Sequence, residues 1–133
     1  MLNRRTGFEL GHKVQPGEFS GDPLDSAQDI NVLKIIELVR ADADTAGFYF
    51  EESDPRSTCS DGTYKVALVV DPGVDYHWYR QNPDGTWSHK PGHLEATEVD
   101  ASGKPIYDPS VADRDYGLPN YNEFGGFFCT GEE

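Results

Sequence analysis

Cysteine, basic residues and long apolar segments are all scarce in this chain of 133 residues. Its two cysteines, Cys59 and Cys129, are too few for a disulfide framework, and they form either one bridge or two separate thiols. No run of 18 apolar residues is present, so the sequence predicts no transmembrane helix. The first residues also lack the apolar segment of a signal peptide, so the chain as written predicts a cytoplasmic location.

Basic residues number only 11 against 24 acidic ones, which gives a net charge of −13. A surface of this sign repels the phosphate backbone of nucleic acids and the anionic face of membranes. We therefore predict that neither nucleic acid nor a membrane is a partner. The charge is typical of an acidic soluble protein, and it leaves open a role as a binder of a basic protein partner.

The hydrophobic pattern predicts a single α+β domain that covers the whole chain. Apolar residues recur at helical spacing over residues 25–43. Residues 64–70 form a continuous apolar run that is typical of a strand buried on both faces. Residues 48–50 and 124–129 are expected to add further strands. Because the helical pattern comes first and the strands follow, we expect N-terminal helices packed on an antiparallel sheet.

The most informative stretch is a predicted hairpin over residues 75–90, because the chemistry of its turn is specific. In the segment Pro83-Asp84-Gly85, proline presets a turn angle and glycine supplies the left-handed residue of a bulge. A three-residue loop of this kind pairs Asn82 with Thr86. The turn therefore fixes the register of the two strands that it joins.

Two histidines, His77 and His89, flank this turn, and the register decides whether they meet. With the predicted loop, both lie on one face of adjacent strands, roughly 6–8 Å apart between Cα atoms. A loop one residue longer would put them on opposite faces. Two imidazoles on one sheet face can serve as an acid/base pair, as part of a metal site or as a polar surface.

The first interpretation is a thiol–imidazole site, which needs a cysteine nucleophile, a base and a group that orients the base. We assign His77 as the base and His89 as the orienting group. The candidate nucleophiles are Cys59 and Cys129. Neither lies at a helix N-terminus, where the dipole would lower a thiol pKa, and Cys129 lies in an apolar run typical of packing.

Two other interpretations of the histidine pair remain open. His93 would add a third imidazole for a metal, but no Cys-x-x-Cys or His-Glu-x-x-His motif accompanies it, so we predict no metal ligand set and no cofactor. In a purely structural interpretation, Trp78, Tyr79 and Trp87 cover the hairpin and the histidines bond to the backbone. If the hairpin borders a cleft, these aromatic side chains are expected to line it.

The spacing of the two histidines across a hairpin resembles that of the NlpC-type cell-wall hydrolases, a branch of the papain-like cysteine peptidases. Residues 64–92 and 99–129 more closely resemble a group of bacterial and phage-associated proteins. The matching motifs include Asp-Tyr-His-Trp-Tyr-Arg-Gln at 75–81 and Asp-Gly-Thr-Trp-Ser-His-Lys-Pro-Gly at 84–92. The resemblance implies a papain-like fold, a peptide or amide substrate, and catalysis by a cysteine.

The N-terminal residues bear on where that cysteine would lie. In the resembling group, an Asn-Cys-Tyr motif opens a helix, and residues 2–7 and 15–17 look like the continuation of that segment. The implied cysteine would then fall just before Met1. The resemblance therefore implies a papain-like peptidase or amidase domain whose nucleophile lies outside this chain. Either the chain begins at an internal methionine of a longer enzyme, or it is a scaffold without its nucleophile. The alternatives are a non-catalytic acidic interaction protein, phage- or effector-associated, and a metal-binding domain.

Overall fold

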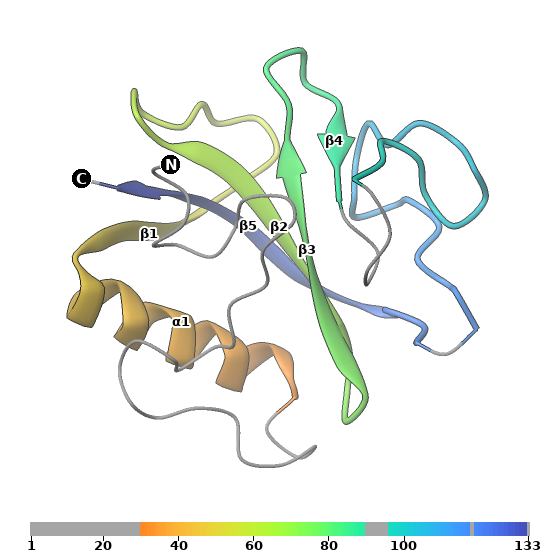
Figure 1. Cartoon of the computed structure of the whole chain (residues 1–133), viewed down its shortest axis with the longest axis horizontal. Coiled ribbons are helices and arrows are strands. Elements are labelled where there is room, and N and C mark those ends of the chain that lie inside the picture. Colours follow the sequence, from red (N-terminus) through yellow and green to blue (C-terminus); the bar gives the residue numbers. More distant parts are fainter. Residues whose placement is uncertain (1–29, 90–95, 118, 133) are drawn as a thin grey trace.

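A computed structural model describes residues 30–89, 96–117 and 119–132 and shows one helix and a five-stranded antiparallel sheet (Figure 1). The helix and the strands have these bounds: α1 Val32–Ala46, β1 Phe48–Ser53, β2 Tyr64–Asp71, β3 Asp75–Gln81, β4 Trp87–Ser88 and β5 Glu123–Glu132. The strand order is β1-β5-β2-β3-β4. The predicted α+β class is therefore confirmed, with one helix rather than several in the part of the chain that is described.

Helix α1 begins later than the periodicity predicts, because Asn31 caps it. The Asn31 backbone is extended, and its side-chain oxygen accepts a hydrogen bond from the Lys34 N–H at 2.9 Å. At the other end, Gly47 takes a left-handed conformation with φ 79°, and its N–H donates to Ala43 O. The helix thus runs to Ala46 rather than Ala43, and the predicted start at 25–29 lies outside the described residues.

Strand β5 lies between β1 and β2 and contains a β-bulge at Gly125. Leu68 pairs with Gly126 and Val69 pairs with Phe124, so that Gly125 is an extra residue on the β5 side. A Cβ at this position would lie 2.7 Å from Leu68 Cδ2, which a real side chain could not tolerate without a shift. A glycine at this site lets β5 bend while its pairing with β2 continues on both sides of the bulge.

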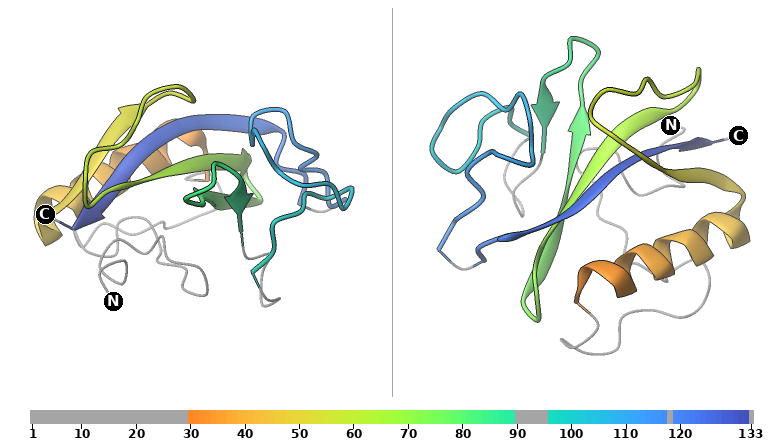
Figure 2. Two further views of the ribbon diagram at one scale, coloured as in Figure 1. Left: turned by 90° about the horizontal axis from the view of Figure 1, so that it is seen from above. Right: turned by 180° about the vertical axis from the view of Figure 1, so that it is seen from behind.

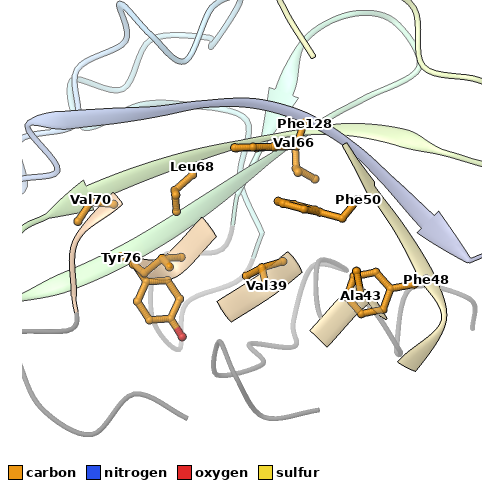
Figure 3. Close-up of a cluster of buried hydrophobic side chains, with 10 residues drawn as sticks. Val39, Ala43, Phe48, Phe50, Val66, Leu68, Val70, Tyr76 and Phe128 are labelled. Atoms are coloured by element: carbon orange, nitrogen blue, oxygen red, sulfur yellow. The ribbon is translucent and has the colours of Figure 1, made fainter. Parts of the chain in front are cut away.

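The sheet buries apolar side chains on both faces, and β2 contributes to both. On the face that packs against α1, the cluster comprises Ile35, Val39, Ala43, Phe48, Phe50, Val66, Leu68, Val70, Tyr76 and Phe128 (Figure 3). On the opposite face, the cluster comprises Ala67, Val69, Tyr79, Trp87, Ile106, Tyr121 and Phe127. The prediction that residues 64–70 form a strand buried on both faces is confirmed.

The sheet is strongly curved, and α1 and the segment that follows β4 lie at opposite ends of it (Figure 2). The described residues between β4 and β5 form no helix and no named strand, and isolated bridges hold them, including His89–Thr97 and Val99–Pro105. The described part of this segment packs on the face of the sheet that carries the histidine pair, through Ile106 and Tyr121. The candidate site thus lies between a regular hairpin and an irregular segment.

Candidate active site: a histidine pair on the sheet

The turn of the β3–β4 hairpin has the predicted three-residue loop. The Asn82 N–H donates to Thr86 O at 2.7 Å, and the Gly85 N–H donates to Asn82 O at 3.0 Å. Gly85 has a φ of 94°, the left-handed value that the bulge requires. Further along the strands, Arg80 pairs with Ser88. The predicted register is therefore confirmed.

The register brings the two histidine rings into direct contact. His77 Nε2 lies 2.8 Å from His89 Nδ1, and His89 Nε2 lies 2.9 Å from Val99 O. The ring centroids are 5.0 Å apart and the rings are nearly perpendicular, at 81°. The prediction that both imidazoles share one face of the sheet is confirmed, and Val99 extends the pair into a chain of three polar groups.

The direction of these hydrogen bonds follows from their last member, Val99. A carbonyl oxygen only accepts, so His89 Nε2 must carry a hydrogen and donate it. In a neutral His89 ring, Nδ1 then has the lone pair and accepts from His77 Nε2–H. A neutral His77 would accordingly keep its own lone pair on Nδ1, the nitrogen on the other side of the ring.

Burial keeps His89 in this neutral form. His89 is 0% exposed and His77 is 9% exposed. Burial lowers the pKa of His89 below its usual 6.5, and the hydrogen bond to Val99 O and the negative charge of Asp100 offset only part of that effect. The lowered pKa therefore keeps His89 in the form that accepts a hydrogen bond from His77 at Nδ1.

Tyr121 and Asp75 complete the surroundings of His77. The Tyr121 ring stacks on His77 with the centroids 5.3 Å apart and the planes at 23°. Its hydroxyl donates to Asp75 Oδ2 at 3.0 Å. Burial and the charge of Asp75 raise the pKa of Tyr121, so the phenol stays neutral. Neither residue is predicted from the sequence as part of the site. Asp75 could have been, because it lies two residues before His77 on one strand and therefore shares its face.

The predicted cleft of Trp78, Tyr79 and Trp87 is wrong. Trp78 lies on the other face of the sheet, where its ring meets Phe50 edge-on at 6.4 Å, because neighbouring residues of a strand point to opposite faces. Tyr79 and Trp87 share the face of the histidines, but both are buried in its core. The three aromatic residues are thus packing residues in two separate clusters.

The two cysteines are joined to each other in a disulfide. Their assignment as candidate nucleophiles is therefore wrong, because neither Cys59 nor Cys129 has a thiol. The bond ties the loop between β1 and β2 to β5. The sequence left open one bridge or two separate thiols, and the structure has the bridge. A thiol partner for His77 does not come from these two residues.

Neither a metal site nor a membrane span emerges from the described ranges. No group of three or more His, Cys, Asp or Glu side chains is placed to hold a metal ion in the part of the chain that the structure describes. His93, the third histidine of the metal interpretation, lies outside the described residues. No described helix is both long enough and apolar enough to cross a bilayer.

Comparison with known proteins shows that half of the chain is similar to a shell protein. Over 66 residues it is 50% identical to insoluble matrix shell protein 1 of Ruditapes philippinarum, a match that covers 50% of this chain and 42% of that protein. The chain thus spans less than half the length of this relative. No model of a known family matches it, and no solved structure does.

Proposed function

We propose that this chain supplies the base and the orienting residue of a papain-like cysteine peptidase or amidase site. The supporting observation is the directed chain of hydrogen bonds from His77 through His89 to Val99 O. A buried neutral imidazole that accepts at Nδ1 holds the neighbouring ring in one orientation and one tautomer. His77 Nδ1 then carries the lone pair that a general base needs.

In this proposal, His77 takes the proton of a thiol at Nδ1 and returns it to the leaving amine. The imidazolium that forms in between keeps its Nε2–H bond to His89, so the ring does not turn during the proton transfers. Since Cys59 and Cys129 are bonded to each other, the thiol must belong to a segment that this chain does not contain. The resemblance to proteins with an upstream Asn-Cys-Tyr motif supports the same requirement.

The proposal predicts a reactive thiol in protein expressed with the coding sequence that lies upstream of Met1. Iodoacetamide should alkylate it readily near pH 6, where an ordinary thiol of pKa about 8.5 is protonated. The variant His77→Ala should slow alkylation and peptide-amide hydrolysis at least about 100-fold. His89→Asn keeps an acceptor oxygen and should retain more activity than His89→Leu.

A matched control for this experiment is Tyr107→Phe, since Tyr107 is an exposed aromatic residue away from the histidine pair. This variant should react and hydrolyse like the wild type. An upstream sequence without cysteine would contradict the proposal. So would a thiol whose alkylation rate is the same in the wild type and in His77→Ala.

A second candidate function is that of a non-catalytic, acidic interaction domain in an extracellular matrix. It is favoured by the 50% identity to a protein named as an insoluble matrix component of shell. The net charge of −13 and the disulfide fit this candidate, because disulfides persist in oxidising surroundings such as those outside the cell. In this role the protein would bind a basic component through its surface charge.

This second function predicts that the purified chain sediments with insoluble shell matrix and that salt releases it. Binding should be strong at 0.1 M salt, where the Debye length is about 10 Å, and largely lost at 1 M, where it is about 3 Å. His77→Ala should bind like the wild type, which separates this function from the catalytic one. Recovery of the protein only in the supernatant at low salt would rule the matrix role out.

A further inference from the structure

Tyr121 has both of its backbone polar groups and its hydroxyl engaged in hydrogen bonds, although it lies outside any helix or named strand. Its N–H donates to Arg114 O at 3.1 Å, and its carbonyl accepts from Arg114 Nε at 2.8 Å. Its hydroxyl donates to Asp75 Oδ2 at 3.0 Å. The residue is thus tied both to its own segment, through Arg114, and to the start of β3, through Asp75.

Two carboxylates beside the β2–β3 turn hold the segment that contains Tyr121. Asp71 ends β2, Asp75 begins β3, and the two lie directly opposite each other in the strand register. Like charges in this arrangement destabilise a strand pair. Each carboxylate here accepts a hydrogen bond from one of two consecutive residues, Asp71 Oδ2 from the Asn120 N–H at 3.0 Å and Asp75 Oδ2 from Tyr121. These bonds offset the repulsion and fix the position of the Tyr121 ring.

The Tyr121 ring covers one face of the His77 imidazole. The two rings stack with their centroids 5.3 Å apart and their planes at 23°. Tyr79 meets the same imidazole nearly edge-on, at 82° and also 5.3 Å. His89 contacts the imidazole at Nε2. The His77 ring is therefore held at one edge by a hydrogen bond and on a face by an aromatic ring.

The contact on the face matters because the last torsion of a histidine side chain, χ2, has broad energy minima. A half-turn about χ2 would put a carbon atom in the place of His77 Nε2 and would break the hydrogen bond to His89. An imidazole that turns in this way sweeps through the space on either side of its own plane. The Tyr121 ring occupies that space on one side, so it opposes the rotation.

We propose that Tyr121, fastened by Asp75, is a positioning residue that keeps the His77 imidazole in the orientation in which Nε2 faces His89. The inference rests on the proposed function, because it assigns Tyr121 a part in presenting the lone pair of His77 Nδ1. A positive charge on the His77 ring would also lie within about 6 Å of the Tyr121 centroid, where the face of an aromatic ring attracts a cation. Tyr121 would thus orient the neutral base and stabilise its protonated form.

The test compares the wild type with Tyr121→Phe by the NMR shifts of the histidine ring nitrogens at about pH 8, above the usual histidine pKa of about 6.5. The signals of His77 are those that disappear in His77→Ala. In the wild type the ring hydrogen should reside on Nε2. Phenylalanine keeps the ring and its packing but loses the bond to Asp75. We expect the ratio of the Nε2–H to the Nδ1–H form of His77 to fall about 3- to 10-fold, the equivalent of one hydrogen bond.

Two further variants make the result specific. Tyr121→Leu also removes the stacked ring and should lower the tautomer ratio further. Tyr116→Phe is the matched control, because Tyr116 belongs to the same segment and its ring lies 6.2 Å from that of Tyr121. This control loses the same hydroxyl group and should leave the His77 signals unchanged. Urea unfolding reports the stability of each variant separately, since a purely structural Tyr121 would change stability and leave the tautomer as it is.

A wild-type tautomer ratio in Tyr121→Phe and Tyr121→Leu would overturn the proposal, as would an equal change in Tyr116→Phe. In protein expressed with the upstream coding sequence, Tyr121→Phe should also slow thiol alkylation about 3- to 10-fold, in step with the tautomer ratio. Failure of the proposed function gives a different result. In that case His77→Ala leaves alkylation unchanged, while the His77 tautomer still depends on Tyr121.

Discussion

Removal of the Cys59–Cys129 disulfide is expected to lower the free energy of unfolding by about 4 kcal/mol. The two cysteines are 70 residues apart in the sequence, and the bond closes a loop of that length in the unfolded chain. A cross-link over so long a loop removes much of the conformational entropy of the unfolded state. The decrease in the free energy of unfolding should therefore be large, even though the bond joins only one loop to one strand.

The measurement is urea unfolding of the double variant Cys59→Ala, Cys129→Ala, followed by tryptophan fluorescence. Wild-type protein kept reduced is the control, because it loses the same bond and keeps both sulfur atoms. The two samples should unfold at similar urea concentrations, well below that of the oxidised wild type. A difference of less than about 1 kcal/mol between oxidised and reduced protein would contradict the expected entropy effect.

The histidine pair could be predicted because its geometry is set locally. Pro83-Asp84-Gly85 determines the length of the turn, and the turn determines which residues of the two strands face each other. Everything needed to place His77 beside His89 lies within the hairpin. The contact between the two histidines can be predicted from the sequence alone, because residues close to them in the chain determine it.

The rest of the site depends on contacts between distant segments, which no local pattern specifies. Val99 comes ten residues after His89, beyond the described end of the hairpin, and Tyr121 is 46 residues from the aspartate that it bonds. The cysteine pairing and the bulge at Gly125 are equally non-local. For the same reason, the sequence suggested an aromatic cleft where the two faces of the sheet instead place Trp78 and Tyr79 in separate cores.

The start of α1 shows a second limit of prediction from the sequence, which concerns the residue at which a helix begins. The pattern at residues 25–29 offered a plausible helix start, yet Asn31 supplies the cap. Both stretches contain residues that commonly cap helices, and propensity alone does not rank them. Asn31 lies one turn before Ile35, which with Val39 and Ala43 packs α1 against the sheet.

Replacement of His89 by leucine is expected to destabilise the protein by about 1–3 kcal/mol near pH 7.5, because one buried and one part-buried polar group lose a partner. These groups are Val99 O, which accepts from His89, and the Nε2–H of His77, which donates to it. Leucine fills much of the same volume, so the loss reflects the hydrogen bonds rather than a cavity. Urea unfolding of the wild type and His89→Leu gives the difference directly.

The same pair of proteins tests the protonation state on which the proposed base depends. The folded-state pKa of His89 lies below its unfolded value, so the unfolded chain takes up a proton that the folded state does not. The stabilising effect of neutral His89 should be complete above about pH 6.5 and should decrease as the pH falls from there toward the folded pKa. The stability gap between wild type and His89→Leu should therefore narrow between about pH 7.5 and pH 5.

The carboxylates of Asp54 and Asp84 do not mimic this narrowing. Hydrogen bonds hold the pKa values of Asp54 and Asp84 below 3.8, so these carboxylates remain charged throughout the range and contribute equally to both proteins. In a His77→Ala background, where the neighbouring ring cannot titrate, a gap that widened toward pH 5 would mean that folded His89 takes up the proton. In the intact pair, its Nδ1 would then donate rather than accept, His77 would lose the contact that fixes its tautomer, and the pair could not act as a base with an orienting partner.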